Sequence, residues 1–337
     1  MNKFFVFVIL FLGVVLVALS FGELETILQT LQRAHLGFLL LAILIQIAWF
    51  FSTGRMYQSI FHLLGDHEDV FTLGRIATAA NFINIVAPTA GAGGVALFAA
   101  EAKRRGHPSG KATVAAALFL LLDQAAFLVI LSLGFIILVR RNNLDAGEIS
   151  ASLILFGMAV VFATGLYVGY RSAERLGNFL AKLARGINAV VRLFSRKNYL
   201  SEERAHEFAH ELAEGFSGLT EQPSSLIRPT IWGIFDKCLL MLVLVCSFLA
   251  FEVPFTAGTI IAGFSMAYLF LIVSPTPSGI GIVEGLMPIT LSSLNVNWSE
   301  SVDITLLYRA VTFWFPLAVG AVAFRSLHKD RADPAME

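Results

Sequence analysis

Long apolar runs separated by short polar stretches make up most of this chain. About 20 consecutive apolar residues are enough for a helix to cross a bilayer. The apolar runs cover residues 4–19, 36–54, 72–99, 112–139, 151–170, 229–251, 257–273 and 303–324. The pattern predicts an all-α polytopic membrane protein with about six full transmembrane helices and two broken or re-entrant hairpins, at 72–99 and 257–300.

Composition supports a membrane protein. Of the 337 residues 57% are hydrophobic and only 14% are charged, whereas soluble domains carry about 25% charged residues. The net charge is zero, so no nucleic-acid partner is expected. The two cysteines, Cys238 and Cys246, share one apolar run and offer neither a disulfide framework nor a metal site.

One integral membrane domain is expected over residues 1–337. It divides into a first half at 1–170, cytoplasmic amphipathic helices at 171–228 and a second half at 229–324. The segment 171–228 is polar and basic with an apolar stripe at helical spacing. It fits either a helix at the membrane interface or a solvated helix covering the bundle. The run at 4–19 is expected to be a retained helix, with a cleaved signal peptide as the alternative.

The stretch 274–284, Ser-Pro-Thr-Pro-Ser-Gly-Ile-Gly-Ile-Val-Glu, cannot continue a helix. Proline removes an amide donor and clashes with the preceding turn. Broken backbone at membrane depth persists only where it is buried in protein or lines a polar cavity. A carboxylate such as Glu284 held there indicates a functional site.

A short motif recurs in the two halves. Val86-Ala87-Pro88-Thr89 returns as Val273-Ser274-Pro275-Thr276, and each copy is followed by glycines. If both hairpins return to the side they entered from, most Lys and Arg residues lie in cytoplasmic segments, with both termini cytoplasmic. The two hairpins then enter from opposite sides, which predicts an inverted-topology repeat with a substrate site at its breaks.

Five ionisable residues stand inside apolar runs: Asp123, Asp236, Lys237, Glu284 and Arg309. Each would cost at least about 2.5 kcal/mol at the bilayer centre if it faced lipid. We expect them to face the bundle interior and to pair, either as structural ion pairs or around a cavity. Asp236 and Lys237 lie nearer a helix end and could instead extend toward the interface. Arg309 and Lys237 together would suit a phosphate group.

His206-Glu207-Phe208-Ala209-His210 matches the H-E-x-x-H pattern, in which two histidines bind zinc and the glutamate acts as base. Charged residues crowd this segment and no third ligand is evident. A solvated helix face is the favoured interpretation, so no metal or other cofactor is expected. A membrane metalloprotease stays a remote alternative.

The C-terminal motif resembles a known family. Residues 275–284 are similar to the P-x-P-G-G-x-G-x-x-E signature of the lysylphosphatidylglycerol synthase transmembrane-region family, also called flippase-like. The last apolar run resembles that family's pattern through Tyr308-Arg309, Phe313-Trp314, Pro316 and Gly320. Asn84, Pro88, Gly93 and Asp123 resemble its first broken segment and the helix after it. Gly94 and Phe119-Leu120 depart from the family, which usually has an acidic residue and Glu-Arg there.

The resemblance implies a bacterial or archaeal cytoplasmic membrane protein that moves or handles lipids. A stand-alone lipid flippase-like transporter that is not an enzyme is expected. The chain is not expected to be the synthase, because it leaves no room for the soluble synthase domain. The expected partners are a membrane lipid, most simply a phosphate-bearing one, with a homodimer and a lipid-synthesis enzyme left open. A non-transporting scaffold for such an enzyme is the alternative. The expected substrate-binding residues are Asn84, Pro88, Thr89, Gly91, Gly93, Asp123, Lys237, Pro275, Thr276, Pro277, Gly279, Gly281, Glu284, Tyr308 and Arg309.

Overall fold

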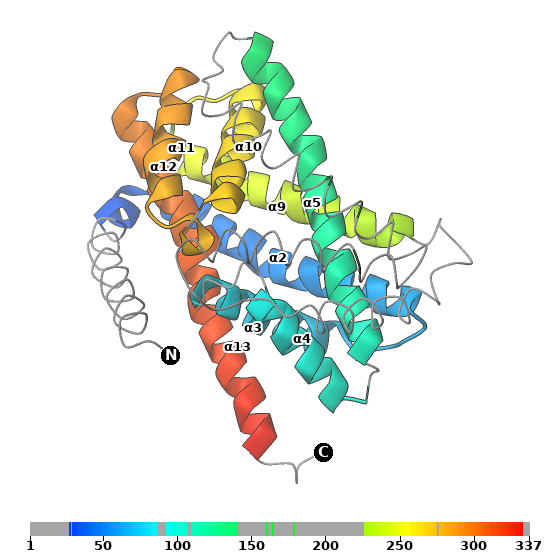
Figure 1. Cartoon of the computed structure of the whole chain (residues 1–337). Helices are drawn as coiled ribbons and strands as arrows, with labels where there is room; N and C mark the ends of the chain where they lie inside the picture. The colour runs from blue at the N-terminus through cyan, green and yellow to red at the C-terminus, as the bar shows by residue number, and fades with distance from the viewer. Residues whose placement is uncertain are drawn as a thin grey trace, which may run out of the picture.

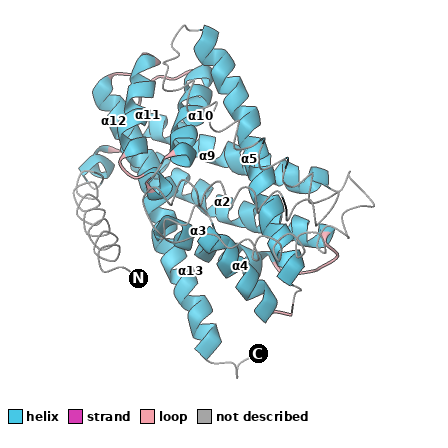
Figure 2. Ribbon diagram, viewed as in Figure 1, coloured by secondary structure: helices cyan, strands magenta, loops and turns pink. Residues whose placement is uncertain are grey.

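A computed structural model describes residues 29–86, 92–106, 109–140, 226–274 and 276–332, with a few single positions besides. Every regular element in these ranges is helical, as Figure 2 shows. The helices in chain order are α2 (Leu36–Leu63), α3 (Val70–Val86), α4 (Ala92–Arg104), α5 (Ser109–Arg140), α9 (Ile227–Ala250), α10 (Ala257–Val273), the short turn η2 (Pro277–Gly279), α11 (Ile282–Ser293), α12 (Trp298–Arg309), the π-helical segment η3 (Ala310–Trp314) and α13 (Phe315–Ala332).

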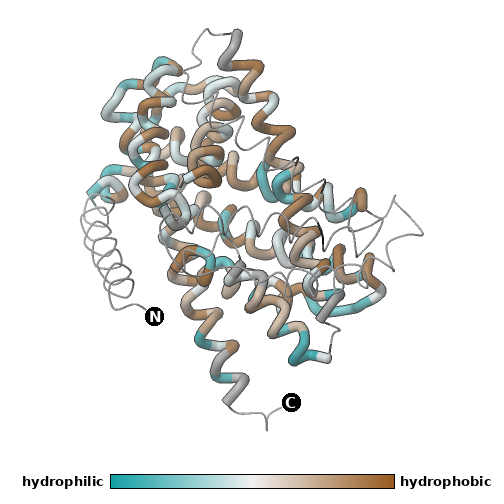
Figure 3. Tube along the Cα trace, viewed as in Figure 1, coloured by the Kyte–Doolittle hydropathy of each residue, from teal (hydrophilic) through white to brown (hydrophobic). Residues whose placement is uncertain are grey.

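Four helical stretches in the described ranges are long and apolar enough to cross a membrane. They are Leu36–Leu63, Lys111–Ile137, Ile227–Ala250 and Trp298–Leu327. Figure 3 shows hydrophobic positions along much of these helices and hydrophilic ones near the far end of α4. Apolar side chains such as Leu40, Leu44 and Val322 stay exposed on the outer faces, as expected where lipid is the solvent.

Breaks divide both predicted hairpins into paired shorter helices. α3 ends at Val86 and α4 begins at Ala92, while α10 ends at Val273 and α11 begins at Ile282. The last apolar run, by contrast, is longer than the predicted 303–324, because α12, η3 and α13 follow one another without a gap. The prediction of a polytopic helical membrane protein is confirmed.

The packing crosses between the two halves of the chain. α2 and α9 make the most extensive contact, and they lie across the centre of the molecule in Figure 1. α5 of the first half packs against α10 of the second, and α13 of the second half packs against α3 of the first. In Figure 1, α10–α12 gather toward one end of the molecule and α3 and α4 toward the other.

Two glycines allow the crossed contacts to be close. A Cβ atom at Gly134 in α5 would lie 2.3 Å from the Ser265 hydroxyl of α10. A Cβ atom at Gly320 in α13 would lie 2.8 Å from Cβ of Phe82 in α3. Separations below 3.0 Å leave no room for a side chain, so both helix pairs depend on these glycines.

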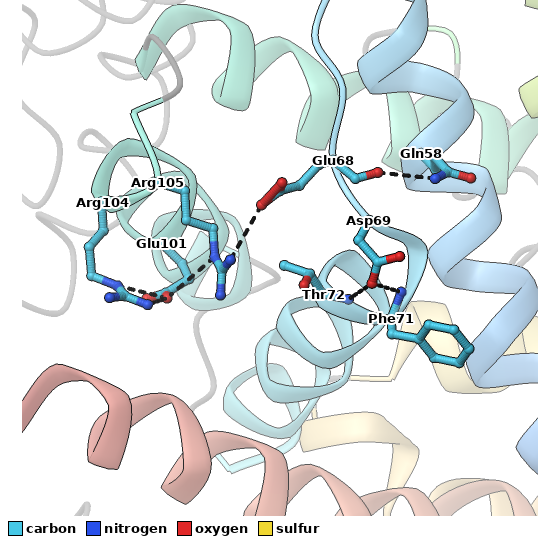
Figure 4. A network of polar contacts seen from close by, with 8 residues as sticks. All are labelled: Gln58, Glu68, Asp69, Phe71, Thr72, Glu101, Arg104 and Arg105. Carbon is cyan, nitrogen blue, oxygen red and sulfur yellow. Dashed lines mark hydrogen bonds and ion pairs between the residues drawn. The ribbon is translucent and has the colours of Figure 1, made fainter. Parts of the chain in front are cut away.

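A network of charged and polar groups closes one end of the first half (Figure 4). The fully buried Glu101 accepts two hydrogen bonds from Arg104, and Arg105 reaches Glu68 at 3.4 Å. Asp69 caps α3 by accepting from the backbone N–H groups of Phe71 and Thr72. The network ties the start of α3 to the end of α4, and so holds the first hairpin together at its base.

Candidate functional site

The second break is a tight turn built by its own hydroxyl and glycine residues. Thr276 donates its backbone N–H to the Ser274 hydroxyl at 3.1 Å and its own hydroxyl to the carbonyl of Ile280 at 2.9 Å. Gly279 and Gly281 have φ angles of 73° and 77°, and Ser278 reaches 49°. Glycine adopts such angles without steric cost, whereas Ser278 is held there against its own preference.

Arg309 connects this turn to the last long helix. Its Nε donates to Glu284 Oε1 at 2.5 Å and its Nη2 to the carbonyl of Ser278 at 3.1 Å. The other carboxylate oxygen of Glu284 accepts from the backbone N–H of Gly281 at 2.9 Å, at the start of α11. The arginine is only 1% exposed, and its guanidinium also lies over the Phe313 ring at 4.4 Å. The predicted pairing of Arg309 is thus present, and it spans the broken backbone.

The helix changes its winding directly after Arg309. Residues Ala310–Trp314 form a π-helical turn. Pro316 follows, and it has no N–H to give to the carbonyl of Thr312, so a regular α-helix loses a hydrogen bond here. Such π-helical turns occur often at functional sites.

A second charge cluster joins three unbroken helices. Lys237 in α9 donates to Asp123 of α5 at 2.6 Å and to the Tyr268 hydroxyl of α10 at 2.5 Å. Tyr268 in turn donates to the other oxygen of Asp123 at 3.4 Å. Lys237 and its neighbour Asp236 are each 1% exposed and lie well inside α9. The sequence-based alternative, that they extend toward the interface, is wrong, because helices α2, α5 and α10 cover them.

A cavity of about 130 Å³ lies between these two clusters. Both halves of the chain contribute to its wall, and Arg309 and Tyr268 bring one member of each cluster to its surface. Since a water molecule needs about 10–15 Å³ of such space, the cavity has room for several waters or one phosphate-sized group. The lining residues are Gln46, Trp49, Asn81, Ile85, Leu240, Ala267, Tyr268, Leu271, Ser278, Val283, Tyr308, Arg309, Thr312 and Phe313.

The structure separates the predicted site residues into several groups. Arg309 and Tyr308 line the cavity, while Lys237 lies behind Tyr268 and does not line it. Asp123 and Glu284 neutralise the two cations from outside the cavity wall. The remaining second-half residues, Thr276, Pro277, Gly279 and Gly281, form or flank the turn that carries Ser278.

In the first break, Asn84 and Gly94 form a close contact. The Asn84 side chain accepts from the backbone N–H of Gly94 at 2.8 Å. A Cβ atom at Gly94 would lie 2.5 Å from the Asn84 side chain, so a larger residue at position 94 would require that side chain to shift. Gly93 lies in the first turn of α4. The other predicted positions, Pro88, Thr89, Gly91 and Pro275, lie outside the described residues.

Sequence reasoning missed four polar or aromatic residues of the cavity wall: Gln46, Trp49, Asn81 and Tyr268. Asn81 and Tyr268 could have been found from the repeated motif, because they occupy equivalent positions: they are separated by the same number of residues as Pro88 and Pro275. Gln46 and Trp49 had no such signal. The Gln46 carbonyl oxygen and the Trp49 indole nitrogen are buried without a hydrogen-bond partner among the described residues. They leave an acceptor and a donor unused in the cavity wall.

The histidine pattern at 206–210 lies outside the described residues. Within the described ranges, no three His, Cys, Asp or Glu side chains are grouped so that they could hold a metal ion. The cluster around Lys237 has only two carboxylates, and its amine takes the position that a cation would need.

The sequence is similar to known membrane proteins. Residues 4–320 match the family model "Lysylphosphatidylglycerol synthase TM region". A UPF0104 membrane protein of Methanothermobacter thermautotrophicus is 25% identical over 72% of this chain and 71% of its own length. Another UPF0104 membrane protein, of Methanocaldococcus jannaschii, is 19% identical over 94% of this chain and 92% of its own length. No solved structure matches the chain. Since the family model covers nearly the whole sequence, this multi-pass membrane protein belongs to the lysylphosphatidylglycerol synthase transmembrane-region family.

Proposed function

We propose that this protein is a lipid transporter of the flippase type in a bacterial or archaeal cytoplasmic membrane. A phosphate-bearing headgroup would enter the cavity between two inverted halves, with Arg309 as its principal cation. The observation that carries the proposal is the cavity itself, which residues of both halves line and which has a buried arginine in its wall. An arginine fork is well suited to phosphate oxygens.

Several features support an inverted repeat. α3 and α10 have 17 residues each, and both end at the repeated motif. The crossed packing is reciprocal, since α5 contacts α10 as α13 contacts α3. The glycines of these contacts, Gly134 and Gly320, follow Asp123 and Arg309 at the same spacing. In transporters built this way, substrate sites lie at the interface of the repeats, where helices are broken.

Each of the two buried cations is paired with a carboxylate. Glu284 neutralises Arg309 in the present conformation, and an incoming phosphate would compete with that carboxylate for the guanidinium. The cavity has room for a phosphate-sized group, and we propose that the two halves move apart to admit the rest of the headgroup. A movement of the broken turn at 276–281 would be transmitted to the last long helix, because Arg309 of that helix bonds to the turn.

The orientation and the partners belong to the same proposal. The distribution of Lys and Arg favours cytoplasmic termini, and it would place the network of Figure 4 on the cytoplasmic side. A lipid is the proposed ligand, and the protein is proposed to act without catalysing a reaction. A homodimer or an associated lipid-synthesis enzyme is compatible with this role.

Reconstitution into liposomes tests the function. The purified protein should accelerate the movement of fluorescent phospholipids between the leaflets. Arg309→Ala and Glu284→Gln should each lower that rate at least about tenfold, the equivalent of about 1.4 kcal/mol. Arg33→Ala is the matched control, since it removes an exposed arginine from an ion pair with Asp303. Equal rates for all four proteins would contradict the proposed site.

Native mass spectrometry of the gently purified protein identifies the ligand. One enriched lipid class that is lost in Arg309→Ala and kept in Arg33→Ala would name the substrate. Only bulk membrane lipid, unchanged by either substitution, together with co-purification of a synthesis enzyme, would favour a non-transporting scaffold instead.

A further inference from the structure

The two buried clusters differ in their charge balance. Arg309 and Glu284 are one cation and one carboxylate. The other cluster holds Lys237 with two carboxyl groups, Asp123 and Asp236. The amine of Lys237 bonds to Asp123 and Tyr268, and Asp236 has no ion pair of its own among the described residues.

The surroundings of Asp236 are buried and sparse in hydrogen bonds. The residue is 1% exposed, and Thr53 of α2 donates its hydroxyl to Oδ2 at 3.2 Å. The other oxygen, Oδ1, has no hydrogen-bond partner among the described residues. The nearby charged groups are Lys237 on α9 and Asp123 on α5, and α2 adds the hydroxyl of Ser52.

Among the described residues, no ion pair joins Asp236 to a cation on the other helices around α9, and Arg55 of α2 bonds to Gln58. From α10, Tyr268 bonds to Lys237, and from α12, Arg309 bonds to Glu284. If both aspartates were ionised, the cluster would carry one net negative charge inside the protein. A carboxylate without a cation in such a place is costly, and binding a proton removes the charge.

We propose that Asp236 is a proton-binding site, occupied in this conformation, and that release of its proton is coupled to lipid movement. Only the coupling rests on the proposed transport function; the bound proton does not. A proton needs no volume, which fits a carboxyl group enclosed between α2 and α9 that does not line the cavity.

The geometry also links this proton to the cavity. While Asp236 is neutral, Lys237 stays on Asp123 and Tyr268. Loss of the proton leaves a negative charge beside the lysine and draws its amine toward Asp236. Tyr268, which lines the cavity, then loses its bond to the lysine and becomes free to bind an entering group.

Infrared spectroscopy of the purified protein in lipid tests the bound proton directly. The wild-type protein at neutral pH should show the carbonyl band of a protonated, buried carboxylic acid, and Asp236→Asn should lose it. Asp303→Asn, which removes a carboxylate that is paired with Arg33 and not with Lys237, should keep it. If Asp236→Asn fails to fold, Thr53→Val gives the second measurement, because loss of its hydrogen bond should shift the band.

Absence of the band from the wild-type protein, or its survival in Asp236→Asn, would overturn the proton site. A band that disappears on adding sodium chloride but not choline chloride, with a rise in thermal stability, would assign the site to sodium instead.

Proteoliposomes with an imposed pH gradient test the coupling. The gradient should change the rate of lipid movement several-fold in the wild-type protein and leave Asp236→Asn unaffected. A wild-type rate that ignores the gradient would overturn the coupling. If no variant moves lipid at all, the proposed function fails, and the infrared band still decides whether Asp236 holds a proton.

Discussion

The two buried ion pairs of this protein are attached to different kinds of backbone. Lys237 and Asp123 join α9 to α5, two unbroken helices, and Tyr268 adds α10. Arg309 and Glu284 join a π-helical turn to a broken hairpin, and the arginine also bonds to the carbonyl of Ser278 in the turn. The first pair therefore fixes the packing of rigid helices, whereas the second can change with the conformation of a loop. A pair of opposite charges can thus serve stability at one place and conformational change at another.

Removing the lysine of the rigid pair should have the largest effect. Lys237→Met leaves Asp123 buried without its cation and should lower the free energy of unfolding by about 3–5 kcal/mol. Thermal or denaturant unfolding of the purified protein measures the loss. The double variant with Asp123→Leu should regain most of it, because no unpaired charge remains. Lys111→Met is the control, since Lys111 pairs with Asp66 where both are partly exposed, and it should cost about 0–1 kcal/mol. Equal losses in the two lysine variants would contradict the assigned role.

Glu284→Gln should lower the free energy of unfolding less than Lys237→Met does, but it should have a larger effect on phosphate binding. The amide keeps an acceptor for the Gly281 N–H but loses the charge that holds Arg309. The substitution should therefore lower the free energy of unfolding by about 2–3 kcal/mol. The freed guanidinium should bind inorganic phosphate more strongly than in the wild-type protein, as measured by thermal stabilisation with added phosphate. Asp123→Asn should give no such gain, because its partner Lys237 does not line the cavity. Equal thermal stabilisation by phosphate in Glu284→Gln and Asp123→Asn would contradict the claim that only the Arg309 pair faces the cavity.

Alanine substitutions at Gly279 and Gly281 of the broken turn distinguish the cost of backbone strain from the cost of steric crowding. Both have φ near 75°, where an alanine costs about 1–2 kcal/mol. A Cβ atom at Gly281 would meet nothing within 4 Å, but at Gly279 it would lie 2.7 Å from Val283. Gly279→Ala should therefore lower the free energy of unfolding by about 1 kcal/mol more than Gly281→Ala does. A reversed order in unfolding experiments would show that the turn is built differently.

The smallest expected effect is a stabilisation, from an alanine substitution at Gly285. Gly285 lies inside α11, and a Cβ atom there would meet nothing within 4 Å. Gly285→Ala should raise the free energy of unfolding by up to about 1 kcal/mol, because alanine loses less backbone entropy in a helix. It should also slow lipid movement if α11 must unwind at its first turn when the site opens. A destabilised Gly285→Ala would mean that α11 is not a regular helix at this position.

Local chemistry made most of the fold predictable. Pro275 and Gly279 predict the second break. The turn there is formed by contacts between residues close in sequence. The charged residues were expected to pair because lipid cannot solvate them. Their partners could not be assigned, because Lys237 meets Asp123 only after α9 and α5 pack together.

The sequence alone determined that the chain is a helical membrane protein, that the segments 72–99 and 257–300 are broken, and that Asp123, Glu284 and Arg309 were expected inside. Those properties depend on hydrophobic length and on residue-level backbone preferences, which are local. Only the tertiary structure decided that Arg309 faces the cavity while Lys237 lies behind Tyr268, and that Asp236 has no ion pair within the described part of the chain. Those properties depend on how α2, α5, α9 and α10 approach one another, and contacts between distant segments leave no local pattern in the sequence.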